Sequence, residues 1–417
     1  MINYERHILD NGLQLVIHED HSTKMAVTNI IYKVGSRNEV AGKTGLAHYF
    51  EHLMFGGSKN VPSFDSALER VGGECNAFTN TDITNYYVTL PATNIETAFW
   101  LESDRMLQLN LSHKTIETQR KVVIEEFKQR YLNQPYGDAM HQLRQLCYQN
   151  HPYQWPTIGK EIADIEGFTE TDIRSFYHDH YAPNNAILVV AGDVNSEEIL
   201  EMTQKWFGPI PAAKKNGASI IQEIPQKGKR IHTCLADVPT DALYKAYHVP
   251  GRLQSGYLEC DLITDILGFG RSSLLEQKLV KNTDIFASCN AYVLGSMDPG
   301  LMVFSGKMEK GKSAEEAEKV LDEVVQEFIE TAISSETIEK VKNQAEAMKT
   351  YESIQLINRA MNLAYYTQLG TPDLYQMEYD KKTTITADQI SAFAKQTIIE
   401  ENASTLYYKS NKNGTSA

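Results

Sequence analysis

The chain has 417 residues and a mass of 47.1 kDa, which is too large for one core of ordinary size and predicts two domains or two similar halves. Hydrophobic residues make up 42% and charged residues 23%, a globular composition that excludes a globally disordered chain. The formal net charge of -14 has the wrong sign for a protein that binds a nucleic-acid backbone, and it favours basic ligands.

The cysteines and the apolar runs indicate the environment of the chain. The five cysteines are scattered, include no C-x-x-C pair and are interpreted as reduced structural thiols. The N-terminal residues are charged, and the longest apolar run, 186–191, is far shorter than a membrane span. We therefore expect no membrane partner and a cytoplasmic location, or a periplasmic one if a leader has been trimmed.

Strand-like and helix-like segments alternate along the chain and predict an α+β fold. Strands are expected at residues 13–17, 27–34, 86–90, 186–190, 242–249, 291–294 and 301–305. Helices are expected at residues 92–109, 115–131, 172–181, 196–207, 256–267 and 314–331. Both halves show the same alternation, and the segment from Pro209 to Arg230 is rich in proline, glycine and lysine. The expected domains are residues 1–213 and 231–417, joined by a linker at 214–230.

The strongest local signal is a short apolar segment with two histidines. Thr44 as N-cap and Gly56 as C-terminal stop predict a helix between them. His48 and His52 lie one turn apart on one face, so both imidazoles can reach a single ion, and Glu51 stands beside them. The segment therefore predicts a buried helix that presents two imidazoles and a carboxylate.

The order H-x-x-E-H is that of inverted zinc peptidases, in which the glutamate is the general base for a zinc-bound water. Zinc lowers the pKa of that water to about 7, and the carboxylate removes its proton and later returns it to the leaving amine. On this hypothesis His48 and His52 bind zinc and Glu51 is catalytic. The alternative is a pair of satisfied core histidines with a solvent-facing glutamate, which the spacing within an apolar helix disfavours.

A catalytic zinc needs a third protein ligand, and the pair Glu125 and Glu126 offers one on a downstream helix. On a helical wheel Glu125 points nearly opposite to the apolar face, whereas Glu126 lies at its margin, one turn from Val122. The periodicity selects Glu126. The alternative, that both carboxylates are simply solvated, stays open at this point.

These residues resemble the pitrilysin-type inverzincin peptidases, whose relatives include the mitochondrial processing peptidase and insulin-degrading enzyme. The zinc helix and the distal glutamate are the specific part of a resemblance that spans nearly the whole chain. Supporting segments are 10–13, 34–39, 76–79, 122–126, 181–184 and 189–193. The resemblance implies two similar halves, each a mixed or antiparallel sheet flanked by helices, that enclose a peptide chamber and of which the second is inactive. It also implies one zinc ion per chain, held by His48, His52 and Glu126.

The resemblance further suggests which residues face the substrate. Asn76, Ala77 and Phe78 belong to a strand that receives an extended peptide by main-chain pairing in such enzymes. The alternative for these three is an ordinary strand and turn. Seven residues before the third ligand the family usually has a glutamate, and here Gln119 takes its place. The support of the metal ligands is therefore altered, and a lower rate is expected.

A second departure from the family concerns the stabilisation of the oxyanion. Active members carry an arginine and, seven residues later, a tyrosine in the C-terminal half, and here Val280 and Ala287 fall on these positions. Losing one such donor typically costs about two to three powers of ten in rate. The hypothesis that follows is a zinc-carrying subunit that cleaves peptides together with a homologous companion chain, a homodimer remaining possible. The rival hypothesis is a non-catalytic subunit for assembly or substrate presentation.

One further motif points to another chemistry. The segment from Gly306 to Ser313 satisfies the phosphate-loop pattern between a strand and a helix. Glu309 would place a carboxylate beside phosphate, and no apolar strand ending in a metal-binding aspartate follows. Nucleotide binding is therefore disfavoured.

Overall fold

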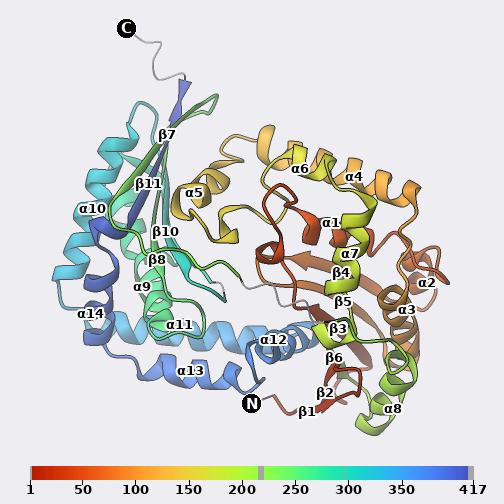
Figure 1. Cartoon of the computed structure of the whole chain (residues 1–417). Coiled ribbons are helices and arrows are strands. Elements are labelled where there is room, and N and C mark those ends of the chain that lie inside the picture. Colours follow the sequence, from red (N-terminus) through yellow and green to blue (C-terminus); the bar gives the residue numbers. More distant parts are fainter. Residues whose placement is uncertain (1, 215–219, 296, 412–417) are drawn as a thin grey trace. The chain divides into compact units, whose positions relative to one another are not determined.

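Two β-sheets organise the part of the chain that the computed structural model describes, namely residues 2–214, 220–295 and 297–411 (Figure 1). Each sheet has its own hydrophobic core, so these residues divide into two compact units. The first unit takes the described residues of Met1–Phe127, Trp155–Ile220 and Met348–Gln376, and the second those of Lys128–Gln154, Ile221–Ala347 and Met377–Ala417. No described helix is both long and apolar enough to cross a membrane.

The first unit is built on a mixed sheet. Its described strands are β1 (Glu5–Ile8), β2 (Gln14–Glu19), β3 (Met25–Tyr32), β4 (Glu74–Thr79), β5 (Thr84–Pro91) and β6 (Ala186–Gly192). They lie in the order β1-β2-β6-β3-β5-β4, in which β2 and β6 are parallel and the other neighbours antiparallel. This order puts β4 at one edge of the sheet.

Helices cover both faces of the first sheet. They are α1 (Leu46–Leu53), α2 (Phe64–Glu69), α3 (Ile95–Leu107), α4 (His113–Phe127), α6 (Ile162–Glu166), α7 (Glu170–His180), α8 (Ser196–Phe207) and α12 (Leu356–Leu369). Alternate residues of the strands, among them Val27 and Val189, form one core with Ala360 and Leu363 of α12. On the opposite face Tyr86 of β5 donates its hydroxyl to the carbonyl of Phe50 in α1, 3.2 Å away.

The second unit repeats this sheet. Its described strands are β7 (Arg230–Ala236), β8 (Ala242–Val249), β9 (Phe286–Leu294), β10 (Gly300–Met308) and β11 (Ala403–Ser410). They lie in the order β7-β11-β8-β10-β9, with β7 and β11 parallel and the rest antiparallel. In order and direction, these strands match β2, β6, β3, β5 and β4 of the first sheet. The match confirms the predicted fold class of two similar halves with mixed sheets.

The helices of the second unit also cover both faces of their sheet. They are α5 (Ala139–Cys147), α9 (Tyr257–Gly268), α10 (Ala314–Glu330) and α14 (Ala387–Thr397), while α11 (Ser335–Ile354) and α13 (Leu374–Thr384) have residues in both units. Leu143 of α5 shares a core with Val303 of β10 on one face. Ile263 of α9 and Leu321 of α10 share a core with Phe304 on the other.

The compact units do not follow the boundaries expected at residues 213 and 231. Residues 128–154, which contain α5, belong to the second unit, and residues 348–376, which contain α12, belong to the first. The physical reason is that each sheet buries one face under a helix from the other half of the sequence. The expected linker at 214–230 includes residues 215–219, which lie outside the described residues, and β7 begins at its last residue, Arg230.

The segment that matches the phosphate-loop pattern is the end of an antiparallel strand. Gly306 belongs to β10, and Ser313 caps α10 by accepting a hydrogen bond from the main-chain N–H of Glu316. The ammonium group of Lys312 lies 2.8 Å from the carboxylate of Asp284. The lysine of the motif is therefore engaged in an ion pair, and the disfavoured nucleotide hypothesis receives no support from this geometry.

Candidate metal centre

The residue just before α1 has a backbone conformation and a close contact that require glycine. Gly45 has a φ of 97°, and a Cβ on it would lie 2.5 Å from the carbonyl oxygen of Ile158. The helix that follows buries Leu46, Phe50 and Leu53 in the first unit. Its end near Gly56 agrees with the prediction, since Leu53 is its last residue and the N–H of Gly56 is bonded to the Leu53 carbonyl.

The N-terminal end of α1 is capped by a residue that the sequence did not indicate. The prediction of Thr44 as N-cap is wrong, because its hydroxyl donates to the Asp164 carboxylate and accepts the N–H of Lys160. Glu39 caps the helix instead: its two carboxylate oxygens accept the N–H groups of Gly45 and Ala47 at 2.8 and 2.9 Å. Glu39 is 5% exposed, and this burial raises the pKa of its carboxyl group to about 8.

Three side chains meet beside α1. His48 and His52 project from α1, and Glu126 projects from α4, whose carbonyl at Ile116 accepts the hydroxyl of Tyr49. The Nε2 atoms of His48 and His52 lie 3.6 and 3.2 Å from Oε2 of Glu126. One nitrogen or oxygen atom from each residue lies within 4.8 Å of the others. The structure thus brings together the three residues that the sequence analysis proposed as ligands.

The donor set and its spacing fit zinc. Two imidazole nitrogens and one carboxylate oxygen form the three-ligand set of a catalytic zinc site with an open fourth position. Tetrahedral geometry with ligand bonds of about 2.05 Å places neighbouring ligand atoms roughly 3.3 Å apart. The two distances to Glu126, 3.6 and 3.2 Å, bracket that value. His48 is buried while His52 and Glu126 are half-buried, so an ion here would be shielded and yet reachable.

Glu51 lies on the same helix and is oriented by a strand. The hydroxyl of Thr79, at the end of β4, donates to Oε2 of Glu51 at 2.6 Å. Sequence reasoning did not single out Thr79, although it closes the segment 76–79 on which the resemblance partly rested. Glu51 is half-buried and so remains open to a substrate.

The other proposed residues occupy different surroundings. Asn76, Ala77 and Phe78 lie on β4, which pairs with β5 alone among the described strands. Asn76 and Phe78 are exposed, and the side-chain oxygen of Asn76 accepts the N–H of Ala77 at 2.8 Å. Gln119 lies half-buried on α4, two turns before Glu126, and within the described part of the chain no hydrogen bond joins it to the cluster.

Glu125 and the two positions of the missing oxyanion donors can also be placed. Glu125 is exposed, as the helical wheel predicted, and Glu126 is more buried. Val280 packs against the core of the second unit from a short helical turn, and Ala287 lies on β9. Neither side chain has a hydrogen-bond donor.

Helix α9 is the counterpart of α1 in the second unit. It also follows a left-handed glycine, Gly256 with a φ of 96°, and lies between β8 and β9 as α1 lies between β3 and β4. Counted from that glycine, Glu259, Leu262 and Ile263 stand where α1 has His48, Glu51 and His52. Among the described residues, the single group suited to a metal ion is therefore in the first unit.

This fold and cluster are those of a zinc-peptidase-like protein, and comparison with known sequences gives the family. The family described as "Insulinase (Peptidase family M16)" matches residues 14–161, and "Peptidase M16 inactive domain" matches residues 167–345. The chain belongs to the M16 peptidase family.

Individual relatives agree with this assignment. A protein named "Zinc protease PqqE" from Helicobacter pylori is 31% identical over 345 residues, which cover 81% of this chain and 78% of that protein. The beta subunit of the mitochondrial-processing peptidase of Saccharomyces cerevisiae is 29% identical over 209 residues, 49% of this chain and 45% of that protein. A crystal structure titled as a protease from Helicobacter pylori superposes with a TM-score of 0.93 and 28% identity, covering 98% of this chain and all (100%) of that one.

Proposed function

We propose that this chain is the zinc-binding subunit of an endopeptidase that hydrolyses unstructured peptides. The observation that carries the proposal is the meeting of His48, His52 and Glu126 beside Glu51, whose carboxylate is held by Thr79. A scaffold has no physical need for two imidazoles and a carboxylate around one point. Names of relatives such as "Zinc protease PqqE" support the same reading.

In this proposal, His48, His52 and Glu126 hold one zinc ion. Zinc supplies Lewis-acid chemistry, which makes water a stronger acid near neutral pH and polarises a carbonyl group. Glu51 accepts a proton from the attacking water and returns it to the leaving amine. The hydrogen bond from Thr79 to Oε2 holds the carboxylate of Glu51 that takes part in this transfer.

We propose that the substrate binds along the edge strand β4. An extended peptide can pair with the outer edge of β4, and that edge includes Asn76, Ala77 and Phe78. The side-chain oxygen of Asn76 accepts the N–H of Ala77, which is a group that a substrate main chain would otherwise bind. We infer that the Asn76 side chain swings aside when a peptide adds to the sheet. The net charge of -14 favours basic peptides.

Two substitutions test the assignment of roles. Glu51→Gln keeps the size of the side chain but cannot accept a proton, so peptide cleavage is expected to fall by about 10²–10⁴-fold while one zinc per chain remains. His52→Ala removes a ligand, so zinc content measured by mass spectrometry is expected to fall with activity. His178→Ala, on the exposed face of α7, is the matched control. Wild-type cleavage by Glu51→Gln would refute the proposed base.

The proposed companion chain has its own test. Because Val280 and Ala287 offer no hydrogen-bond donor, the zinc-loaded chain alone is expected to cleave a peptide pool slowly. A homologous chain that supplies an arginine and a tyrosine should raise the rate by about 10²–10³-fold for each donor. Efficient, chelator-sensitive cleavage by the chain alone would contradict the need for a partner. Absence of cleavage even with the companion would favour the non-catalytic role.

A further inference from the structure

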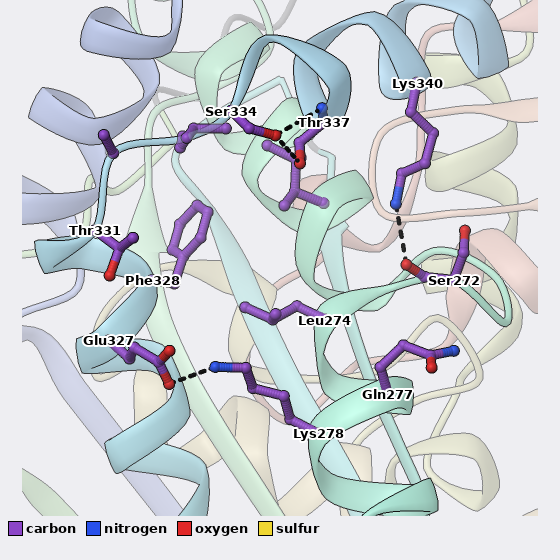
Figure 2. A pocket seen from close by; sticks show the side chains of 13 residues that line it. Ser272, Leu274, Gln277, Lys278, Glu327, Phe328, Thr331, Ser334, Thr337 and Lys340 are labelled. Carbon is purple, nitrogen blue, oxygen red and sulfur yellow. Dashed lines mark hydrogen bonds and ion pairs between the residues drawn. The ribbon is translucent and has the colours of Figure 1, made fainter.

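A cavity of about 290 Å³ lies in the second unit, and its lining includes none of the residues of the proposed zinc site (Figure 2). The end of α10, the loop to α11 and the first turns of α11 form one side, and the segment from Ser272 to Lys278, which follows α9, forms the other. All of these residues belong to the same compact unit. The cavity is therefore a property of that unit alone.

The floor of the cavity is apolar. Phe328 of α10 and Leu274 face the hollow in Figure 2. Ile266 of α9 and Ile333 of the loop complete the apolar lining. Ile266 and Phe328 are 4% and 7% exposed, so they belong to the core, and the cavity opens directly onto it. Binding an apolar group of a ligand against this floor is favourable, because it removes apolar surface from water.

The charges around this floor do not cancel. Lys278 forms an ion pair with Glu327 across the cavity (Figure 2). The ammonium group of Lys340 donates to the main-chain carbonyl of Ser272 at 3.0 Å, and among the described residues no carboxylate lies within ion-pair distance of it. The lining therefore carries one net positive charge, in a chain whose net charge is -14.

The two hydroxyl groups at the start of α11 lie beside this positive end and leave one hydroxyl hydrogen for a ligand. Ser334 and Thr337 share a hydrogen bond between their hydroxyl groups at 2.9 Å, and the N–H of Thr337 donates to the Ser334 hydroxyl at 3.1 Å. Both residues line the cavity at the start of α11, a helix of 20 residues whose dipole favours negative charge at this end. One cation, two hydroxyl groups and an apolar floor thus converge on one small volume.

From this arrangement we propose that the cavity binds a small amphipathic carboxylate, with its anionic group toward Lys340 and its apolar group on Phe328 and Leu274. The volume of about 290 Å³ is at the lower limit for ligand sites and suits a group the size of one large side chain. A single uncompensated charge selects a monoanion. Two sources share this chemistry: the free C-terminal residue of a peptide, and a short fatty acid.

Calorimetric titration of the full chain tests the proposal. N-acetylphenylalanine carries both required groups, its amide lacks the charge, and N-acetylglycine lacks the apolar group. We expect the first to bind at least about 10-fold more tightly than either of the others, because charge-assisted hydrogen bonds and apolar burial both contribute. Hexanoate is the fatty-acid arm: binding tighter than that of N-acetylphenylalanine assigns the source to fatty acids, and weaker binding assigns it to peptide C-termini. Equal binding of the acid and its amide would overturn the proposal.

A variant pair locates the site independently. Lys340→Met keeps the length of the side chain and removes its charge, so the affinity for N-acetylphenylalanine should fall about 10-fold or more. Lys342→Met, two residues further along the same helix and outside the lining, should bind as the wild type does. An unchanged affinity of Lys340→Met would refute the assignment. All titrations contain a chelator, and since the readout is binding, failure here leaves the proposed peptidase untouched.

Discussion

At the scale of single residues, the orientation of Glu51 depends on one hydroxyl group from another element. The side chain of a glutamate has three rotatable bonds, and α1 alone does not fix where its carboxylate points. The hydrogen bond from Thr79, at 2.6 Å, selects one position of that carboxylate. Thr79 is a positioning residue in this view, since it acts through Glu51 rather than on the substrate.

Thr79→Val tests that role because it replaces the hydroxyl by a methyl group of similar size. We expect kcat for peptide cleavage to fall by roughly 10-fold, since the proposed base loses one charge-assisted hydrogen bond worth about 1.5 kcal/mol. Zinc content should stay at the wild-type level because none of the three proposed ligands is touched. Thr89→Val, on the neighbouring strand β5, is the control. A loss of zinc together with the rate would mean that Thr79 supports the fold of the site instead.

The cluster was predictable where a helical pattern marks its residues. Two histidines one turn apart and the glutamate between them define a helix face. On a helical wheel of a second helix, Glu126 lies at the margin of the apolar face and Glu125 points away from it. Thr79 lies 28 residues from Glu51, so no local pattern relates them. Glu39 lies only 6 residues before Gly45, but it was missed because the loop between them has no periodicity.

At the scale of elements, α1 is held at its N-terminus by buried carboxyl groups. Glu39 accepts two N–H groups of the first turn, and Asp164 accepts the N–H and hydroxyl of Thr44 just before it. A buried acid in this place satisfies donors that a helix start always leaves without partners inside the helix. The position of α1, and with it of His48 and His52, therefore depends on a residue outside the helix.

The pH dependence of stability should reveal Glu39. Burial raises the pKa of its carboxyl group from 4.5 to about 8, so between these values the folded chain binds a proton that the unfolded chain has released. The contribution of Glu39 to the free energy of unfolding is therefore fully present below pH 4.5. It falls as the pH rises to 8, by at most about 1.4 kcal/mol per pH unit. Glutamine at position 39 cannot titrate. As the pH rises over this range, the free energy of unfolding of Glu39→Gln should therefore increase relative to that of the wild type.

Urea unfolding at pH 5.5 and 7.5 measures this difference. Trp100, Trp155 and Trp206 all belong to the first unit, so tryptophan fluorescence follows the unit that contains α1. Chelator in all samples removes any effect of metal binding. A difference between Glu39→Gln and wild type that is the same at both pH values would contradict a raised pKa for Glu39.

Several of the elements that the sequence did not predict have little burial, although β11, α5, α12 and α14 have buried residues and were missed as well. The predicted strands and helices are all present, with ends within a few residues. By contrast, α11 has 20 residues of which Val341 alone is buried, and α13 has no buried residue. Without a buried stripe, a helix has no apolar period of 3.6 residues to detect. The edge strands β1 and β7 were missed because most of their residues are exposed or half-buried.

At the scale of the whole molecule, the two halves share a strand order but exchange helices. The face of the first sheet that carries Val189 is covered by α12, and the face of the second that carries Val303 is covered by α5. Amphipathic pattern tells which face of a helix is buried, but not which sheet it will meet. This is why a single cut at the proline-rich segment predicted the two halves but misassigned α5 and α12.

The second unit lacks the proposed metal ligands, because α9 has the left-handed glycine of α1 but has Glu259, Leu262 and Ile263 at the matching positions. Zinc should therefore stabilise the first unit selectively. A ligand present at 1,000 times its Kd adds about 4 kcal/mol to the state that binds it, which corresponds to a rise in Tm of roughly 10 °C for a unit of this size.

Thermal unfolding followed by tryptophan fluorescence should show this rise when zinc is added to chelator-treated protein, because the fluorescence reports the first unit. His52→Ala should show almost none of it, whereas His178→Ala should respond as the wild type does. Amide hydrogen exchange gives the spatial test: α1 and α4, which carry the proposed ligands, should exchange more slowly with zinc, and α9 should not change. If exchange in α9 slowed equally, the second unit would bind zinc too. That result would contradict the expectation drawn from the absence of histidines at the matching positions of α9.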